Sequence, residues 1–368
     1  MLHLKYSNIC YMNLLGYVKT NQLSFKEKAF NEVDALTIAW MSYFDFEPIK
    51  DDLPIRIKDL DKYPYYSKLD PYFPSFMARS SRKIMKALMV SKRYKEMRIL
   101  DTFSLIDKKL NVQFAALAVF INNKIVIAYR GTDPTYTGWK EDFILSYKDK
   151  IHSYSLAEIF FNRIKEKYDE DIILCGHSKG GHIVTYLLSE LEDASEIKHV
   201  YSFDGPGFRT LDLFKNKEDR LDKFTKIIPQ SSFVGVLFSN ETEMKIIKSR
   251  SVMMLQHNCL EWIIKNNEFI YVNKRTLSSR YLDKSINAWI NSLDLETKER
   301  FTEILFGELD KFETQDFTNF FKNLFKQVKP AYKAYRGLSK EDKKLVFYVM
   351  RKLVCNLIKP EKKTSSNN

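Results

Sequence analysis

One serine of this chain is flanked by glycines, in the order Gly176, Ser178 and Gly180, and a further glycine follows at 181. The chain has only 11 glycines in 368 residues, so this spacing is unusual. The mostly apolar residues 171–175 predict a buried strand before the serine, and the dozen residues after it predict a helix. A serine on a tight turn between a strand and a helix stands clear of the sheet, and glycines leave room for the neighbouring backbone. The pattern predicts that Ser178 is a nucleophile, with the helix N-terminus stabilising developing negative charge.

A serine hydroxyl needs a general base to become a nucleophile. Hydrolases with this turn order their residues as serine, acid and histidine, and three of the six histidines follow Ser178. His182 falls one turn into the predicted helix and should point away from the serine. His199 begins a strand, so it should lie at the opposite edge of the sheet. His257, in a loop-like stretch after the strands, is therefore the predicted base.

The acid is expected at the carboxyl end of a strand, near the serine. Asp204 lies at the end of the predicted strand 199–205 and precedes a Gly-Pro-Gly turn. Its carboxylate is therefore placed to orient an imidazole, although it would equally suit a cap on the following turn. Glu241 and Glu261 are weaker candidates.

Two backbone N–H groups are expected to bind the oxyanion that forms when a carbonyl is attacked. The N–H of Lys179, directly after the serine, is the first predicted donor. The second should come from the loop that ends the segment 125–133, where Gly131 or Thr132 presents an N–H and the Thr132 hydroxyl can assist. Charged residues beside this loop are expected to stabilise it rather than to contact substrate: Arg130, Asp133 and Asp142.

Elements of two kinds must position these side chains. Residues 97–132 alternate in polarity around Asn122 and Asn123, which predicts antiparallel strands with a tight turn. Strands at 171–175, 199–205 and 225–238 then alternate with helical segments. Helical patterns occur at residues 24–49, 72–97 and 155–168, and a short strand at 268–272. This order predicts an α/β-hydrolase-like fold class, with a mostly parallel sheet flanked by helices.

The C-terminal part is helical throughout from about residue 282, as an all-helical extension. We expect an α/β-hydrolase-like domain over residues 1–280, a helical region over 281–358 and a flexible tail over 359–368.

Positive charge is concentrated at the C-terminus. The net charge is +12, and residues 321–368 hold 13 Lys or Arg against three acidic residues, a net of +10. This basic region favours an anionic surface as partner, or is simply a solvated helix face. No specific nucleic-acid partner, metal or cofactor is predicted.

The composition of the chain indicates the cellular compartment in which it is expected. The four cysteines are far apart and form no CxxC pair, so reduced, mostly buried thiols are expected. The N-terminal residues lack the design of a signal peptide, and no window resembles a membrane-spanning helix. A cytoplasmic location is therefore expected, and Met12 is a possible alternative start.

Three segments together resemble one family: VIAYRGTDPTYTGWKEDF (126–143), CGHSKGGHIVTYL (175–187) and YSFDGPGF (201–208). They are similar to the Mbeg-like family of lipase-like bacterial proteins, which is related to class 3 lipases of the α/β-hydrolase fold. The likeness extends over about residues 12–275. The resemblance implies Ser178 as nucleophile, the loop with Gly131 and Thr132 as oxyanion loop, and His257 as base.

The chain departs from class 3 lipases at two positions. Ser232 stands where an aspartate is expected, so either Asp204 takes over as acid or the triad is incomplete. Lys179 replaces an apolar residue beside the nucleophile, where it would favour anionic acyl substrates or form a salt bridge. The resemblance also suggests a lid, for which residues 240–256 are the candidate.

Three hypotheses follow. The first is a serine hydrolase of esterase or lipase type, which cleaves small-molecule or lipid carboxylic esters through an acyl-enzyme on Ser178. The second is an acyltransferase or thioesterase with the same nucleophile. The third is a catalytically weak or inactive scaffold whose basic helical C-terminus binds an anionic partner.

Overall fold

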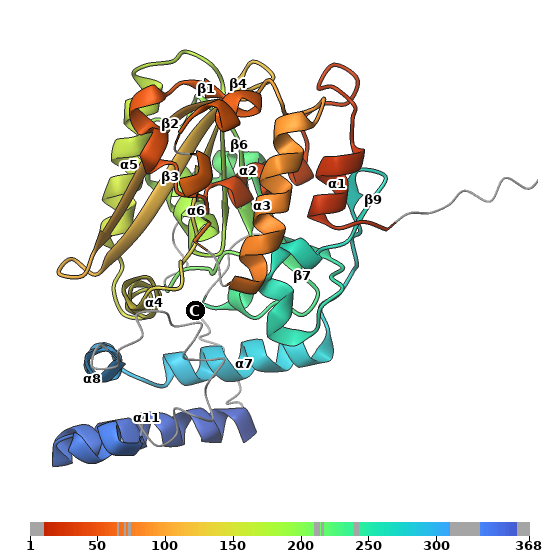
Figure 1. Ribbon diagram of the computed structural model, residues 1–368. Coiled ribbons are helices and arrows are strands. Elements are labelled where there is room, and N and C mark those ends of the chain that lie inside the picture. Colours follow the sequence, from red (N-terminus) through yellow and green to blue (C-terminus); the bar gives the residue numbers. More distant parts are fainter. Residues whose placement is uncertain are drawn as a thin grey trace, which may run out of the picture.

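The computed structural model describes residues 11–309, apart from 65, 70, 73–74, 210–213, 215–216 and 239–242, and residues 332–358. Within these residues, eight strands form one sheet in chain order (Figure 1). The strands are β1 (Ile55–Arg56), β2 (Arg98–Asp107), β3 (Val112–Ile121), β4 (Lys124–Tyr129), β5 (Ile172–His177), β6 (Ile197–Phe203), β7 (Phe224–Pro229) and β8 (Met244–Ile247). Neighbours from β1 to β4 are antiparallel, and neighbours from β4 to β8 are parallel. The predicted fold class, an α/β-hydrolase-like and mostly parallel sheet, is confirmed.

The turn between β3 and β4 follows directly from its sequence. Asn122 and Asn123 have φ angles of 50° and 55°, and asparagine tolerates this left-handed backbone better than most residues. The turn sets Ile121 opposite Lys124, so it fixes the register of the hairpin.

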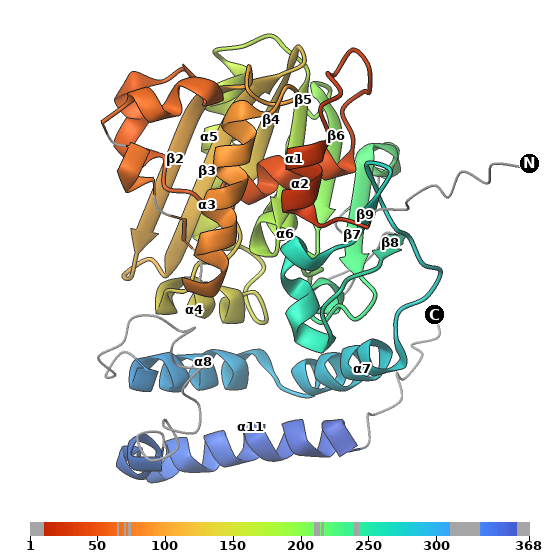
Figure 2. The same cartoon turned by 45° about the vertical axis from the view of Figure 1, so that its right-hand side comes forward.

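Helices cover both faces of the sheet (Figure 2). The helices of the described residues are α1 (Leu14–Thr20), α2 (Glu32–Met41), α3 (Ser75–Val90), α4 (Tyr136–Ile144), α5 (His152–Lys165), α6 (Lys179–Glu190), α7 (Leu277–Asn291), α8 (Leu295–Leu309) and α11 (Lys340–Ile358). Along β4, Val126 and Ala128 face the core under α1, α2 and α3, whereas Ile125 and Ile127 face the core under α5 and α6. A strand that is buried on both faces is apolar at successive positions, as this strand is.

Two predicted strands are shorter in the structure. The segment 225–238 forms a strand only as far as Pro229, since proline has no N–H to continue the ladder. A 3-10 turn, η5 (Val234–Val236), follows it. The predicted strand 268–272 contains only β10 (Glu268–Phe269), which pairs with β9 (Ile264–Lys265).

The C-terminal helices form a layer below the sheet, as predicted for a helical extension. Figure 2 shows α7 and α8 one after the other in a row, with α11 beneath both and in contact with each of them. The ring of Phe306 in α8 meets that of Phe143 in α4 edge-on, with centroids 5.3 Å apart. Because α7 begins at Leu277, it spans the predicted boundary between residues 280 and 281. The predicted tail 359–368 lies outside the described residues.

No helix in the described part of the chain is both long and apolar enough to cross a bilayer.

Candidate active site

Ser178 stands on the sharp turn that joins β5 to α6. It has φ 58° and ψ −129°, a strained conformation for a residue with a side chain. The neighbouring glycines are required by close backbone contacts, since a Cβ on Gly180 would lie 1.9 Å from the carbonyl oxygen of Tyr129. The turn leaves Ser178 partly exposed, as an attacking hydroxyl requires.

The structure brings Ser178, His257 and Asp204 together in one hydrogen-bonded row. Nδ1 of His257 lies 2.7 Å from Oδ2 of Asp204, and Nε2 of His257 lies 3.0 Å from Oγ of Ser178. An ionised carboxylate only accepts hydrogen bonds, so the imidazole proton sits on Nδ1. Nε2 therefore faces the serine with a free lone pair, which is the arrangement that a general base needs.

His257 reaches the serine from η6 (Met253–His257), a 3-10 turn after β8. Its side chain is 29% exposed, whereas Asp204 is fully buried. An exposed apolar stretch, Val252–Leu255, lies just before His257 in the chain, and each of its side chains is at least 56% exposed. Exposed apolar groups thus closely precede the histidine in the chain.

Asp204 follows β6 and is held by three donors. Its Oδ1 accepts hydrogen bonds from Ser232 Oγ at 2.5 Å and from the Gly235 N–H at 3.1 Å. Burial by itself raises the pKa of Asp204, but the hydrogen bonds from His257 and Ser232 and the nearby imidazole charge outweigh it, so the pKa lies below its usual range. The carboxylate is therefore ionised wherever the histidine can act as a base.

Ser232, at the position where an aspartate was expected, supports Asp204 by this hydrogen bond. Of the weaker candidates for the acid, Glu261 lies in η7 (Cys259–Glu261), and Glu241 lies outside the described residues.

His177 is a residue of this site that the sequence analysis missed. Its Nδ1 accepts a hydrogen bond from Tyr43 Oη at 3.0 Å, and its Nε2 donates to the backbone oxygen of His257 at 2.9 Å. Burial, together with the charge of His257, lowers the pKa of His177 to about 3, so the ring is neutral and one nitrogen donates while the other accepts. This pair of bonds fixes the loop of His257 beside the serine. The sequence held no signal for it, because Tyr43 and His257 are distant along the chain.

The loop after β4 packs directly against the serine, as expected for an oxyanion loop. A Cβ on Gly131 would lie 3.0 Å from Cβ of Ser178 and 2.5 Å from the carbonyl oxygen of His177. Arg130 and Asp133 are buried behind the loop and form an ion pair with N···O 3.6 Å.

The Thr132 hydroxyl makes a different contact from the one expected, which was with the oxyanion. It donates to the carboxylate of Asp142, with O···O distances of 2.8 and 2.7 Å. A hydroxyl has one proton, so the expectation that this hydroxyl assists the oxyanion is wrong in this arrangement. The backbone N–H groups of Gly131 and Thr132 remain the candidates on this loop.

The environment of Asp142 can be tested by measuring stability at several pH values. Desolvation raises the pKa of Asp142 to about 6, although the Lys179 ammonium and the Thr132 hydrogen bond lower it in part. A carboxyl whose pKa is higher in the folded chain binds its proton more tightly there, so its contribution to stability falls as pH rises through that window. The quantity to compare is the free energy of unfolding of wild type minus that of Asp142→Asn. This difference should fall by on the order of 1–2 kcal/mol between about pH 4 and about pH 6, a value that allows for the partial exposure of Asp142. Urea unfolding at several pH values measures it, and a flat difference would contradict it.

The side chain of Lys179 is buried and paired. Its Nζ donates to Glu141 Oε2 at 2.6 Å, to the Gln113 backbone oxygen at 2.7 Å and to Gln113 Oε1 at 3.0 Å. Of the two expected roles, the structure has the salt bridge, which holds the ammonium in the interior. The backbone N–H of Lys179 lies in the first turn of α6, where helical N–H groups lack helical partners.

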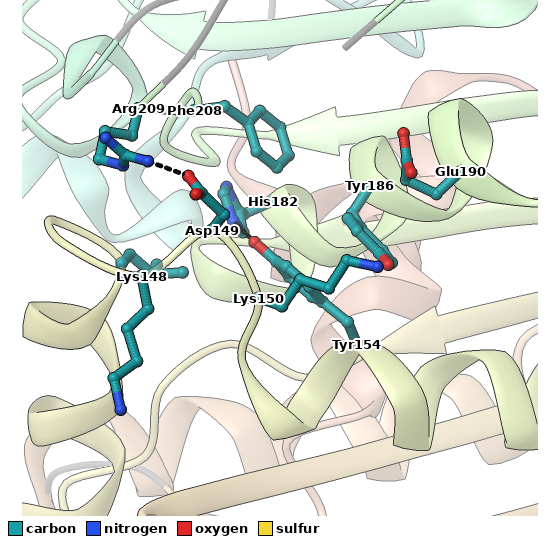
Figure 3. Close-up of a pocket in the computed structure, with 10 residues that line it drawn as sticks. Lys148, Asp149, Lys150, Tyr154, His182, Tyr186, Glu190, Phe208 and Arg209 are labelled. Carbon is teal, nitrogen blue, oxygen red and sulfur yellow. Dashed lines mark hydrogen bonds and ion pairs between the residues drawn. The ribbon is translucent and has the colours of Figure 1, made fainter.

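The other two histidines after the serine lie elsewhere. His182 lines a separate pocket of about 240 Å³ (Figure 3) and contacts Tyr154 Oη and the carbonyl oxygen of Pro206. Nε2 of His199 lies 2.9 Å from the hydroxyl of Thr225. Among the residues that the structure describes, no cluster of three potential metal ligands occurs.

Solved structures similar to this chain include three fungal proteins. Lip2 lipase from Yarrowia lipolytica is 13% identical, with 50% of this chain and 76% of that chain covered and a TM-score of 0.32. An MDLA mutant from Penicillium cyclopium is 11% identical, with 65% and 83% covered and a TM-score of 0.40. Lipase II from Rhizopus niveus is 14% identical, with 58% and 85% covered and a TM-score of 0.36. These scores are too low to establish a common fold, so the fold is assigned from the sheet and the serine turn themselves.

A comparison with curated proteins gives no match. The model of one protein family, described as Mbeg1-like, matches residues 88–307. This segment covers more than half of the chain and includes the serine turn, Asp204, the loop with Gly131 and Thr132, and His257. The chain belongs to the Mbeg1-like family.

Proposed function

We propose that this chain is a serine hydrolase that cleaves carboxylic esters through an acyl-enzyme on Ser178. The observation that carries the proposal is the row from Ser178 through His257 to Asp204, with contacts of 3.0 and 2.7 Å. A partly exposed serine that faces an unprotonated Nε2 is prepared for deprotonation. The buried, ionised Asp204 stabilises the imidazolium that results.

In the proposed reaction, Ser178 Oγ attacks the acyl carbon while its proton passes to Nε2 of His257. The oxyanion is bound by the backbone N–H of Lys179 and by an N–H of the loop with Gly131 and Thr132. The tetrahedral intermediate collapses as His257 returns the proton to the leaving alkoxide. Water then attacks the acyl-enzyme with His257 as base, which releases the acid and restores Ser178.

The exposed apolar residues Val252–Leu255 favour an ester with an apolar acyl chain. They closely precede His257, whose Nε2 lies 3.0 Å from Oγ of Ser178, and we propose that an acyl group bonded to Ser178 extends toward them. Burying apolar surface against such a chain would contribute to binding. We therefore propose that activity increases with acyl length across a series of p-nitrophenyl esters.

The free thiols of Cys175, Cys259 and Cys355 suit a reducing compartment, and we propose a cytoplasmic location. The alternative of an inactive scaffold rested on the absence of an aspartate at 232 and on the basic C-terminal region. The contact between Asp204 and His257 weighs against it.

A fluorophosphonate probe tests the nucleophile. Wild type should be labelled and should hydrolyse p-nitrophenyl butyrate, because the probe reacts only with an activated serine. Ser178→Ala should lose all labelling and reduce turnover about 10⁶-fold. Thermal unfolding of both proteins is the control for folding, and a folded wild type that stays unlabelled would refute the proposed function.

A further inference from the structure

The last helix, α11 (Lys340–Ile358), has one face packed against the rest of the C-terminal layer. Val349 and Asn356 are buried, and Val349 accepts a hydrogen bond from Trp289 Nε1 of α7 at 3.2 Å. At the other end of the helix, Asp342 pairs with Arg300 of α8 at 2.9 Å. These contacts settle which side of α11 faces the molecule, and Figure 2 shows α11 beneath α7 and α8.

The opposite face of α11 carries large apolar side chains in the open. Phe347, Val354 and Ile358 are 64%, 51% and 77% exposed. At 3.6 residues per turn, these positions lie within about 40° of one another around the helix axis. Met350, beside this row, is 44% exposed. A row of exposed apolar groups on one helix face marks an interaction surface.

Basic residues flank this apolar row. Lys340, Lys344 and Arg351 lie on the same side of α11 and are exposed. The two acidic residues of the helix, Glu341 and Asp342, are confined to its first turn. The outer face therefore combines apolar groups with positive charge, as interfacial helices on anionic membranes do.

Exposed aromatic residues lie near the start of α11. Residues 332–337 are helical, and Tyr332 and Tyr335 are 63% and 37% exposed. The carbonyl oxygen of Arg336 accepts a hydrogen bond from Lys343 Nζ at 2.7 Å, so this segment lies against the start of α11. Tyrosine is enriched at the boundary between lipid and water because its ring is apolar and its hydroxyl is polar.

We infer that the outer face of α11 docks the chain on an anionic membrane surface. The row Phe347, Val354 and Ile358 would enter the boundary between headgroups and acyl chains, and the flanking cations would contact lipid phosphates. A second copy of the chain fits less well, because it would set basic residues against basic residues. A nucleic acid would leave the apolar row without a partner, since phosphate contacts are made by polar and charged groups.

Co-sedimentation of the full chain with vesicles tests this inference. Wild type should bind vesicles of phosphatidylcholine with phosphatidylglycerol, and binding should weaken with added salt because charge attraction is screened. Phosphatidylcholine alone should bind much less. The triple variant Phe347→Gln, Val354→Gln, Ile358→Gln should bind at least about tenfold less tightly, since buried apolar area is lost.

Two further variants make the test specific. Replacing Lys340, Lys344 and Arg351 with glutamine should remove the preference for phosphatidylglycerol. Ile159→Gln, which changes a residue of α5 that is 60% exposed, is the matched control and should bind like wild type. Thermal unfolding confirms that each variant folds.

Three outcomes would overturn the inference. In the first, wild type and the apolar triple variant bind vesicles equally. In the second, wild type is a dimer in solution and the triple variant is not. In the third, wild type binds duplex RNA and not vesicles, and the triple variant still binds the RNA. The readout is binding, so it is independent of whether Ser178 is catalytic, and the Ser178→Ala chain should bind vesicles like wild type.

Discussion

Replacing Asp204 with asparagine should lower kcat for p-nitrophenyl butyrate about ten-thousand-fold, while the variant still folds. Asparagine has nearly the same shape, but its NH₂ group would donate to Nδ1 of His257. The imidazole proton would then sit on Nε2 and point at Ser178, so the ring could not accept the serine proton. The variant would also lack the negative charge that stabilises the imidazolium.

Ser232→Ala is the matched control for Asp204→Asn. It removes the 2.5 Å hydrogen bond to Oδ1 of Asp204, but the Gly235 N–H and His257 remain in contact with the carboxylate. Turnover should therefore fall by about tenfold or less, as expected for one hydrogen bond to a charged group. A small effect of Asp204→Asn together with a large effect of Ser232→Ala would show that Asp204 is not the acid.

The arrangement around Ser178 was predictable from sequence to the extent that it depends on local geometry and strand ends. The glycines flanking Ser178 required a tight turn, and parallel strands place Asp204 on the same edge as the serine. The position of His257 followed by elimination among three histidines. Strands β2 to β7 were predictable for the same reason, since alternation and turn residues are local signals, whereas β1 and β8 were not predicted.

The features of the site that the sequence did not predict depend on contacts between segments that are distant along the chain. Nothing near His177 indicates that Tyr43 and the loop of His257 bind its two ring nitrogens. The Thr132 hydroxyl was expected near the oxyanion, but Asp142, ten positions later, accepts its proton. The exposed row on α11 became visible only when Val349 and Asn356 showed which face of the helix is packed.

Replacing Glu141 with glutamine should destabilise the folded chain by about 3–5 kcal/mol, because the change removes the carboxylate that is paired directly with the buried Lys179 ammonium. Both side chains of the pair are 1% exposed, so water cannot take the place of the carboxylate. The Lys179 hydrogen bonds to Gln113 would remain, but neutral acceptors compensate a buried charge only in part. Urea unfolding of wild type and Glu141→Gln measures the difference.

The double variant Glu141→Gln, Lys179→Met separates two effects on stability, that of the charges of this pair and that of the shapes of its side chains. Methionine removes the ammonium and is close to lysine in length. The amide oxygen introduced at position 141 can still accept a hydrogen bond of the kind that Glu141 receives from Ser153 Oγ and the Gln113 N–H. Most of the lost stability should therefore return, since a buried ion pair contributes little beyond what apolar groups of equal volume supply. Fluorophosphonate labelling should also survive, because the proposed oxyanion donor is the backbone N–H of residue 179. If the double variant is as unstable as Glu141→Gln, the loss of stability comes from the missing carboxylate and not from the unpaired ammonium. The carboxylate would then be the group that holds α4 against α6.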